Sequence, residues 1–142
     1  MAERIEVVLR QVIFEMLHPR TLVAITLQPT SVDGSFTAVA INAAVCALLD
    51  SGIPMKRVAY AASGIKDESE KLLLDPTERE ETAASCQFLA VFDPTLPESS
   101  LYLNQTGRFN LESLPEVTKF LYENGICPVN EFITAALRKR FE

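Results

Sequence analysis

Little in this sequence can build a metal centre or a disulfide framework. The 142 residues include three cysteines, one histidine and no tryptophan. Cys46, Cys86 and Cys127 lie far apart without a CxxC pair, so a zinc site or a disulfide is not expected. Each is surrounded by apolar residues, which favours a buried, reduced thiol. His18 precedes Pro19 and has no evident catalytic partner, so we expect a structural or exposed role, with no metal and no cofactor.

Basic residues and long apolar runs are also scarce. Lysine and arginine number 13 against 19 acidic residues, for a net charge of −6 and a pI of about 4.9. An autonomous RNA-binding protein usually carries a basic face, so strong RNA binding by the chain alone is disfavoured. No apolar run approaches the ~20 residues of a membrane helix. The charged start MAERIEVVLR lacks the continuous apolar region of a signal peptide, so we expect an intracellular protein outside the membrane.

The order of hydrophobic patterns predicts one α/β (α+β) domain over residues 1–142. Helices are expected at 2–17 and 35–50, then at Leu111–Glu123 and Val129–Phe141 with a break or kink at Asn124-Gly125 and Pro128. In the second helix, Gly52 is the expected C-terminal cap. Its small residues are expected against a sheet: Ala40, Ala43, Ala44 and Ala47. Strands are expected at Leu22–Leu27, Val58–Ser63, Lys71–Leu74, Ala84–Phe92 and Leu101–Asn104, with turns at Gly64–Glu70 and Thr106-Gly107.

Several short segments in a fixed order resemble the RNase PH family of phosphate-dependent 3′-end RNA nucleases. They are Glu3-Arg4-Ile5-Glu6, Pro19-Arg20-Thr21, Leu27-Gln28 with Asp33-Gly34, Ala40–Ala44, and Ala47-Leu48-Leu49-Asp50-Ser51-Gly52-Ile53-Pro54-Met55. The resemblance implies a two-layer fold of the ribosomal protein S5 domain 2 type. The family domain usually begins with a block of strands before the first of these segments, and we expect this chain to lack that block.

The family binds its attacking phosphate where the second helix begins. Active relatives have glycine, threonine or serine, and arginine there, whereas this chain has Ser35, Phe36 and Thr37. No arginine lies between Arg20 and Arg57, so the bidentate donor is missing. The amides at the helix start and the Ser35 hydroxyl remain as a remnant of a phosphate site. The alternative, which we favour, is that Asp33-Gly34-Ser35 is only a turn and a helix cap.

A pair of carboxylates also falls where the family implies acid–base or metal chemistry. Asp75 matches the first position, within Leu73-Leu74-Asp75-Pro76-Thr77, and Glu81 falls at the second. Such a pair can exchange protons or bind Mg²⁺. Without the phosphate-binding arginine the pair is insufficient for phosphorolysis, and we interpret both residues as vestigial. A solvated acidic loop is the competing interpretation.

The resemblance implies a non-catalytic subunit of the eukaryotic exosome core ring, which processes and degrades RNA from the 3′ end. The expected partners are other RNase PH-like subunits, cap subunits and RNA in the ring channel, in the nucleus, nucleolus and cytoplasm. Arg20, Lys56 and Arg57 are the candidate RNA contacts. One alternative is a self-associating, metal- or phosphate-dependent nuclease that acts on RNA or DNA. The other is an unrelated binding module, because a fold does not dictate a function.

Overall fold

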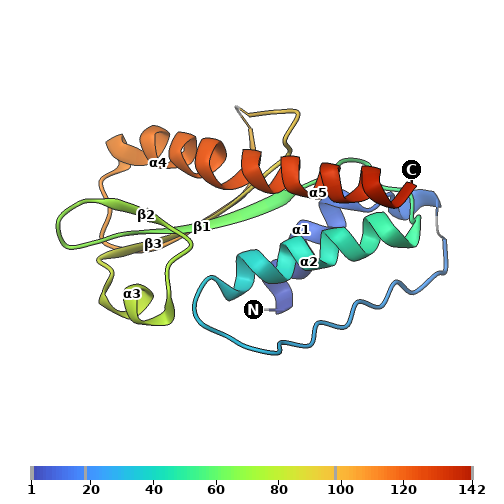
Figure 1. The fold of residues 1–142 in the computed structure, drawn as a ribbon, viewed down its shortest axis with the longest axis horizontal. Helices are drawn as coiled ribbons and strands as arrows, with labels where there is room; N and C mark the ends of the chain where they lie inside the picture. The colour runs from blue at the N-terminus through green and yellow to red at the C-terminus, as the bar shows by residue number, and fades with distance from the viewer. Residues whose placement is uncertain (1, 18, 98, 142) are drawn as a thin grey trace.

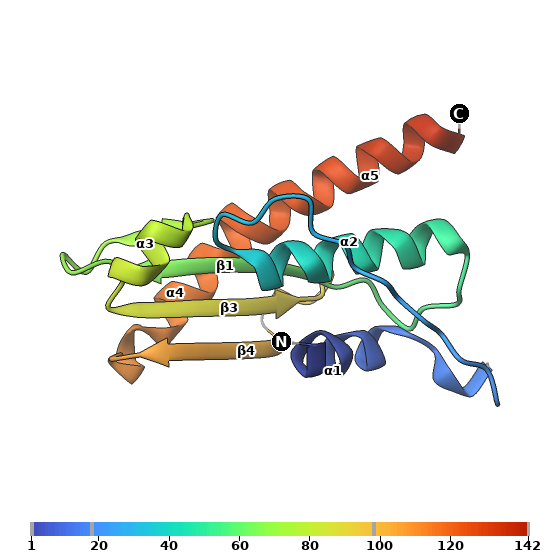
Figure 2. The same ribbon diagram turned by 90° about the horizontal axis from the view of Figure 1, so that it is seen from below.

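A four-stranded antiparallel sheet with helices packed against it forms the structure (Figures 1 and 2). This computed structural model describes residues 2–17, 19–97 and 99–141, so His18 lies outside the described residues. The strands are β1 (Tyr60–Lys66), β2 (Leu72–Leu74), β3 (Cys86–Phe92) and β4 (Ser100–Gly107), in the spatial order β2-β1-β3-β4. The helices are α1 (Ala2–Val12), α2 (Phe36–Ser51), α3 (Glu78–Ala83), α4 (Leu114–Leu121) and α5 (Cys127–Phe141). The expected mixed α/β (α+β) class is confirmed.

The two central strands carry the core of the sheet. β3 has the sequence CQFLAVF and is buried at every position except Gln87, because neighbouring strands flank it on both edges and helices cover it. It pairs with β1 along the full length of both strands, from Tyr60 opposite Phe92 to Lys66 opposite Cys86. Successive side chains of a strand point to opposite faces, so both faces of this pair are apolar.

Helix α4 and the start of α5 lie against one face of the sheet at very short range. Gly64 of β1 faces Leu121, and Gly125 faces Ala62 so closely that an added Cβ would lie 2.5 Å from the Ala62 Cβ. The sequence predicts a break or kink at Asn124-Gly125 and Pro128, and the helical path is not broken there. Residues Tyr122–Ile126 instead form a single π-helical turn that joins α4 to α5 without interruption. The wider turn supplies a glycine at the point of closest approach to the sheet.

Helix α2 packs against β1 and α1, and its buried stripe is regular. The prediction for this helix is confirmed, including its end at Gly52, which has a left-handed φ of 70°. The buried residues are Ala38, Ala40, Ile41, Ala44, Val45 and Leu48. Ala40 and Ala44 are therefore buried as predicted. The prediction for Ala43 and Ala47 is wrong, because these residues are exposed and lie outside the buried stripe of the helix.

Asn42 connects α2 to the part of β1 that β2 does not cover. Its side-chain Nδ2 donates to the Ala61 carbonyl over 2.9 Å, and its Oδ1 accepts from the Ala61 amide over 2.7 Å. β2 pairs only with Gly64, Ile65 and Lys66, so Ala61 has no strand partner on that edge. The amide side chain thus satisfies both backbone groups, which would be costly to leave unpaired at this depth.

The prediction of a strand at Leu22–Leu27 is wrong. Residues 21–29 run extended toward α2, but no strand pairs with them within the described ranges (Figure 1). Their burial still alternates as in a strand: Val23, Ile25 and Leu27 are half-buried and the residues between them are exposed. The segment therefore has the alternating side-chain burial of a strand, but it lacks the hydrogen-bonded neighbouring backbone that defines a strand.

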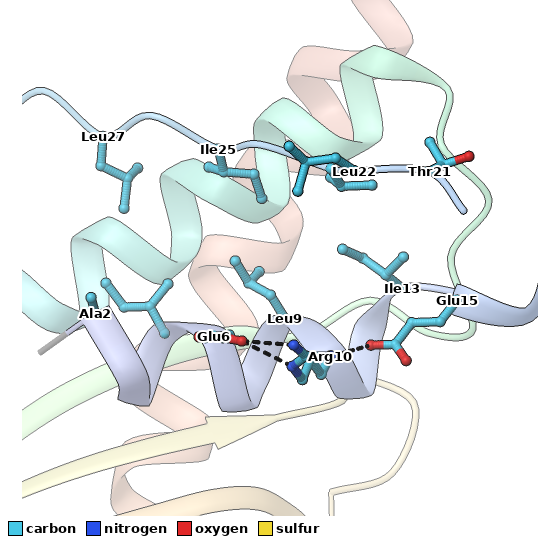
Figure 3. Close-up of a pocket in the computed structure, with 12 residues that line it drawn as sticks. Ala2, Glu6, Leu9, Arg10, Ile13, Glu15, Thr21, Leu22, Ile25 and Leu27 are labelled. Atoms are coloured by element: carbon cyan, nitrogen blue, oxygen red, sulfur yellow. Dashed lines mark hydrogen bonds and ion pairs between the residues drawn. The ribbon is translucent and has the colours of Figure 1, made fainter. Parts of the chain in front are cut away.

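An apolar pocket of about 620 Å³ lies between this extended segment and α1. Figure 3 shows Leu9 of α1 and Ile13, which follows α1, on one side, with Leu22, Ile25 and Leu27 on the other. Below them Arg10 donates to Glu6 and Glu15, at 2.8 and 3.2 Å, and all three side chains are exposed. The pocket is therefore an open part of the hydrophobic core, bordered by a surface ion network that adds little stability.

Several boundaries differ from the sequence-based expectations, and one helix was not expected. The first helix ends at Val12 and not at residue 17, since Glu15–Leu17 forms a separate 3-10 turn. The expected turns at Gly64–Glu70 and Thr106-Gly107 overlap strands, because β1 continues to Lys66 and β4 to Gly107. The acidic run after Thr77 is helical, as α3. Thr77 caps it in a reciprocal arrangement: its hydroxyl accepts from the Glu80 amide, and the Glu80 carboxylate accepts from the Thr77 amide and hydroxyl. These hydrogen bonds from the Thr77 backbone and side chain lower the pKa of Glu80.

A matched pair of substitutions tests the buried stripe of α2. Ala44 is fully buried against the core, whereas Ala43 is exposed on the same helix turn. Ala44→Leu should overpack the interior and lower the free energy of unfolding by roughly 1–3 kcal/mol. Ala43→Leu should change it by about 0.5 kcal/mol or less. Thermal or urea denaturation measures both, and equal effects of the two substitutions would contradict this helix orientation.

Candidate functional site

The start of α2 is held against the segment that leads into α3. Gly34 has a φ of 79°, and an added Cβ would lie 2.2 Å from the Pro76 carbonyl oxygen, so only glycine fits there. Ser35 follows at a left-handed φ of 50°, and its Oγ donates to the same carbonyl over 3.2 Å. The hydroxyl therefore does not cap α2, which corrects the interpretation of Asp33-Gly34-Ser35 as a simple helix cap.

The start of α2 and the start of α3 each receive a carboxylate from the other segment. The Ser35 amide donates to Glu81 Oε1 over 2.8 Å, and the Glu78 amide donates to Asp33 Oδ1 over 3.3 Å. The amides at a helix start are unsatisfied within the helix and attract negative charge. The Glu81 carboxylate thus occupies the position where a helix of this length would hold an anion.

A pocket of about 240 Å³ opens beside these contacts between Ser35 and Glu81 and between Asp33 and Glu78, over one face of the sheet. Its floor comes from alternate residues of three strands, which share that face. The start of α2, the start of α1 and α3 form its walls. It is lined by Arg4, Ser35, Phe36, Thr37, Ala38, Ser63, Gly64, Ile65, Glu81, Gln87, Phe88, Leu89, Asn104 and Thr106. The structure therefore brings together four of the sequence-based candidates: Ser35, Phe36, Thr37 and Glu81.

Sequence reasoning missed the polar groups that the rest of the fold contributes to this pocket. Arg4 supplies a cation from α1, so a guanidinium lines the pocket although none lies between Arg20 and Arg57 in the chain. Ser63 lines it too, and its Oγ is buried without a hydrogen-bond partner among the described residues. Only the packing of α1 beside the start of α2 places Arg4 there, and no local pattern in the sequence encodes that packing.

Asp75 does not line this pocket. It is exposed, with a left-handed φ of 52°, and its amide donates to the Ser63 carbonyl over 3.0 Å. Glu81, in contrast, is half-buried and faces Ser35. The expected approach of both carboxylates to one site is therefore not seen at this pocket. Within the described part of the chain, no cluster of three or more histidine, cysteine or acidic residues is arranged to hold a metal ion.

The thiols offer no nucleophile in the pocket. Cys86 is buried and Cys46 is half-buried, and burial raises the pKa of both thiols. At neutral pH they are therefore protonated and unreactive. Cys127, also half-buried, begins α5, and none of the three lines the pocket.

The three candidate RNA contacts lie apart from the pocket. Arg20, Lys56 and Arg57 are all exposed. The Lys56 ammonium lies 5.8 Å from the centre of the Phe14 ring, just after α1, and the Lys56 amide donates to the Val12 carbonyl. These cations are accessible to a polyanion, but the geometry does not join them to the residues around Ser35. No helix in the described ranges is both long and apolar enough to cross a membrane.

Comparison with known protein families matches residues 1–54 to the 3′ exoribonuclease family, domain 1. A curated relative, the exosome complex exonuclease RRP46 homolog of Arabidopsis thaliana, is 40% identical over 88 residues. That match covers 59% of this chain and 37% of the relative. The chain thus spans well under half the length of this relative. The segment Leu73-Leu74-Asp75-Pro76-Thr77 resembles exosome component 5, or ribosomal RNA processing protein forty-six, and the name of this relative agrees with that resemblance.

Solved structures extend the likeness to nearly the whole chain. Rice (Oryza sativa) Rrp46 superposes with a TM-score of 0.85 at 24% identity, over 95% of this chain and 62% of that one. The cell-death-related nuclease 5 of C. elegans superposes with a TM-score of 0.66 at 27% identity, over 92% of this chain and 81% of that one. The fold predicted from the resemblance is confirmed. Residues 1–54 are thus similar to the 3′ exoribonuclease family, domain 1, and the fold of the chain is that of these two structures.

Proposed function

We propose that the chain is a non-catalytic structural subunit of an exosome core ring. The observation that carries this proposal is the contact between Ser35 and Glu81, because the chain's own carboxylate takes the amide that a phosphate would need. The relative from Arabidopsis is named an exosome complex exonuclease, which supports the exosome as the assembly to which the chain is assigned. The chain would help to form the ring and in this way contribute to RNA processing and degradation, but it would not catalyse a reaction itself.

Phosphorolysis needs more positive charge than the pocket supplies. The reaction brings inorganic phosphate beside a phosphodiester, and two anions approach only where cations or oriented amides offset their repulsion. Arg4 is the one cationic side chain among the residues that line the pocket, and its side chain is exposed. Glu81 adds negative charge at the same place. With Asp75 outside the pocket, the acid–base pair that the reaction requires is incomplete as well.

The surface supports assembly with other chains. Leu22 is 89% exposed and Met16 85% exposed, and both lie near the extended segment whose backbone is unpaired in the described ranges. Exposed apolar side chains and unpaired strand-like backbone favour association with another protein. We propose that the partners are other RNase PH-like subunits and cap subunits in a hetero-oligomer, with RNA in the ring channel. Residence in the nucleus, nucleolus and cytoplasm follows from that assignment.

A nuclease is the second candidate. One of the two superposed structures carries the name of a cell-death-related nuclease, and its fold matches 92% of this chain. Glu81 and the polar lining of the pocket are the groups that such an activity would use. The absence of a suitable metal cluster in the described ranges leaves this candidate without a visible source of a nucleophile.

The first prediction for this function is catalytic silence. Purified chain is incubated with a 3′-tailed RNA, inorganic phosphate and Mg²⁺, and nucleoside diphosphates are quantified. We expect no release above the protein-free rate, because Glu81 occupies the anion position. A robust release that Asp75→Asn or Glu81→Gln abolishes would refute the non-catalytic assignment and favour the nuclease.

The second prediction concerns the exposed cations. In an assembled ring, Arg20→Ala combined with Arg57→Ala should weaken cross-linking of RNA, because phosphate contacts give salt-sensitive, sequence-independent binding. Arg138→Ala combined with Lys139→Ala is the control of equal charge. These residues end α5, where cations favour the helix terminus. Equal loss from both pairs would show that net charge, and not a channel contact, determines RNA binding.

A further inference from the structure

An exposed aromatic ring lies beside two exposed cations just beyond the end of α1. Phe14 follows α1 and is 37% exposed, and the Lys56 ammonium lies 5.8 Å from the centre of its ring. Arg57 is the next residue after Lys56. We infer that these three side chains form a contact for single-stranded RNA, in which a base stacks on Phe14 and the cations bind phosphates. The inference rests on the proposed function, which makes RNA a partner of this chain.

Backbone hydrogen bonds fix the positions of the ring and of the lysine. The Phe14 amide donates to the Pro54 carbonyl over 3.1 Å, and the Lys56 amide donates to the Val12 carbonyl over 2.7 Å. These two hydrogen bonds flank an isolated antiparallel bridge between residues 13 and 55. The backbone that carries the aromatic side chain and the cation is therefore ordered before a ligand arrives, so binding costs less conformational entropy.

The two cations have no carboxylate partner in the described part of the chain. Lys56 and Arg57 are exposed, and neither takes part in an ion pair among the described residues. Glu15, the residue after Phe14, pairs with Arg10 instead. The positive charge beside the ring is therefore available to a phosphate, although the chain as a whole is acidic.

Single-stranded RNA offers both of the groups that this arrangement binds. Its unpaired bases can stack on aromatic side chains, and its phosphates bind exposed cations. The contact between the Lys56 ammonium and the Phe14 ring is weak at an exposed site, so a base can replace the ammonium at the ring while the ammonium moves to a phosphate. Such stacking tolerates any base, because every base has a π face.

A second exposed phenylalanine provides the matched control. Phe132 on α5 is 75% exposed, and no cation lies over its ring among the described contacts. The experiment uses the full chain at low salt with a labelled oligouridylate, and with an abasic ribose-phosphate oligomer of the same length. The variants are Phe14→Leu, Phe14→Tyr, Lys56→Gln and the control Phe132→Leu. NMR spectra establish that each protein is folded and follow the Phe14 ring protons, and fluorescence anisotropy measures affinity.

We expect Phe14→Leu to weaken binding of the oligouridylate about fivefold or more, because the stacked base loses its platform. Phe14→Tyr keeps the ring and should bind as the unmodified chain does, as should Phe132→Leu. Lys56→Gln should weaken binding of both oligomers and reduce its salt dependence.

The abasic oligomer should bind the unmodified chain and Phe14→Leu equally, and only the oligouridylate should shift the Phe14 ring protons upfield. The inference is overturned if folded Phe14→Leu binds the oligouridylate as the unmodified chain does, if Phe132→Leu loses as much affinity, or if the ring protons do not move. None of these results decides the proposed ring role, which instead fails if the chain is recovered from cells without RNase PH-like subunits.

Discussion

The interlock between the start of α2 and the residues from Pro76 to Glu81 determines most of what this structure can do. Two segments 40 or more residues apart in sequence exchange carboxylates, so that each helix start is satisfied by the other segment. Gly34 permits the approach, since any side chain there would collide with the Pro76 carbonyl. The interlock fixes one wall of the pocket and at the same time fills its anion position.

The sequence predicted the elements that local patterns encode. The regular apolar spacing and Gly52 defined α2, and the apolar run CQFLAVF defined β3. The sequence-based predictions were wrong for features that depend on tertiary packing. Leu22–Leu27 has the composition of a strand, but a strand also needs a neighbouring backbone. Gly125 looks like a helix breaker, but at close approach to Ala62 it allows a π turn instead. Ala43 is as small as Ala44, and only the direction of α2 decides which of them is buried.

The same limit applies to the candidate site. Four residues that the resemblance to the RNase PH family singles out line one pocket: Ser35, Phe36, Thr37 and Glu81. Arg4, however, lies about thirty residues earlier and reaches the pocket through the packing of α1. The segment around Ser35 therefore lacks an arginine, but the pocket that this segment lines does contain one, Arg4.

Assembly is the central claim, and the composition of the complex tests it most directly. A tagged copy of the chain is affinity-purified from cells of the organism that encodes it, and the mass of the intact assembly is measured by native mass spectrometry. The account predicts one copy of this chain in stoichiometric complex with distinct RNase PH-like subunits. A stable homo-oligomer of this chain alone, with metal-dependent cleavage of RNA or DNA, would contradict it.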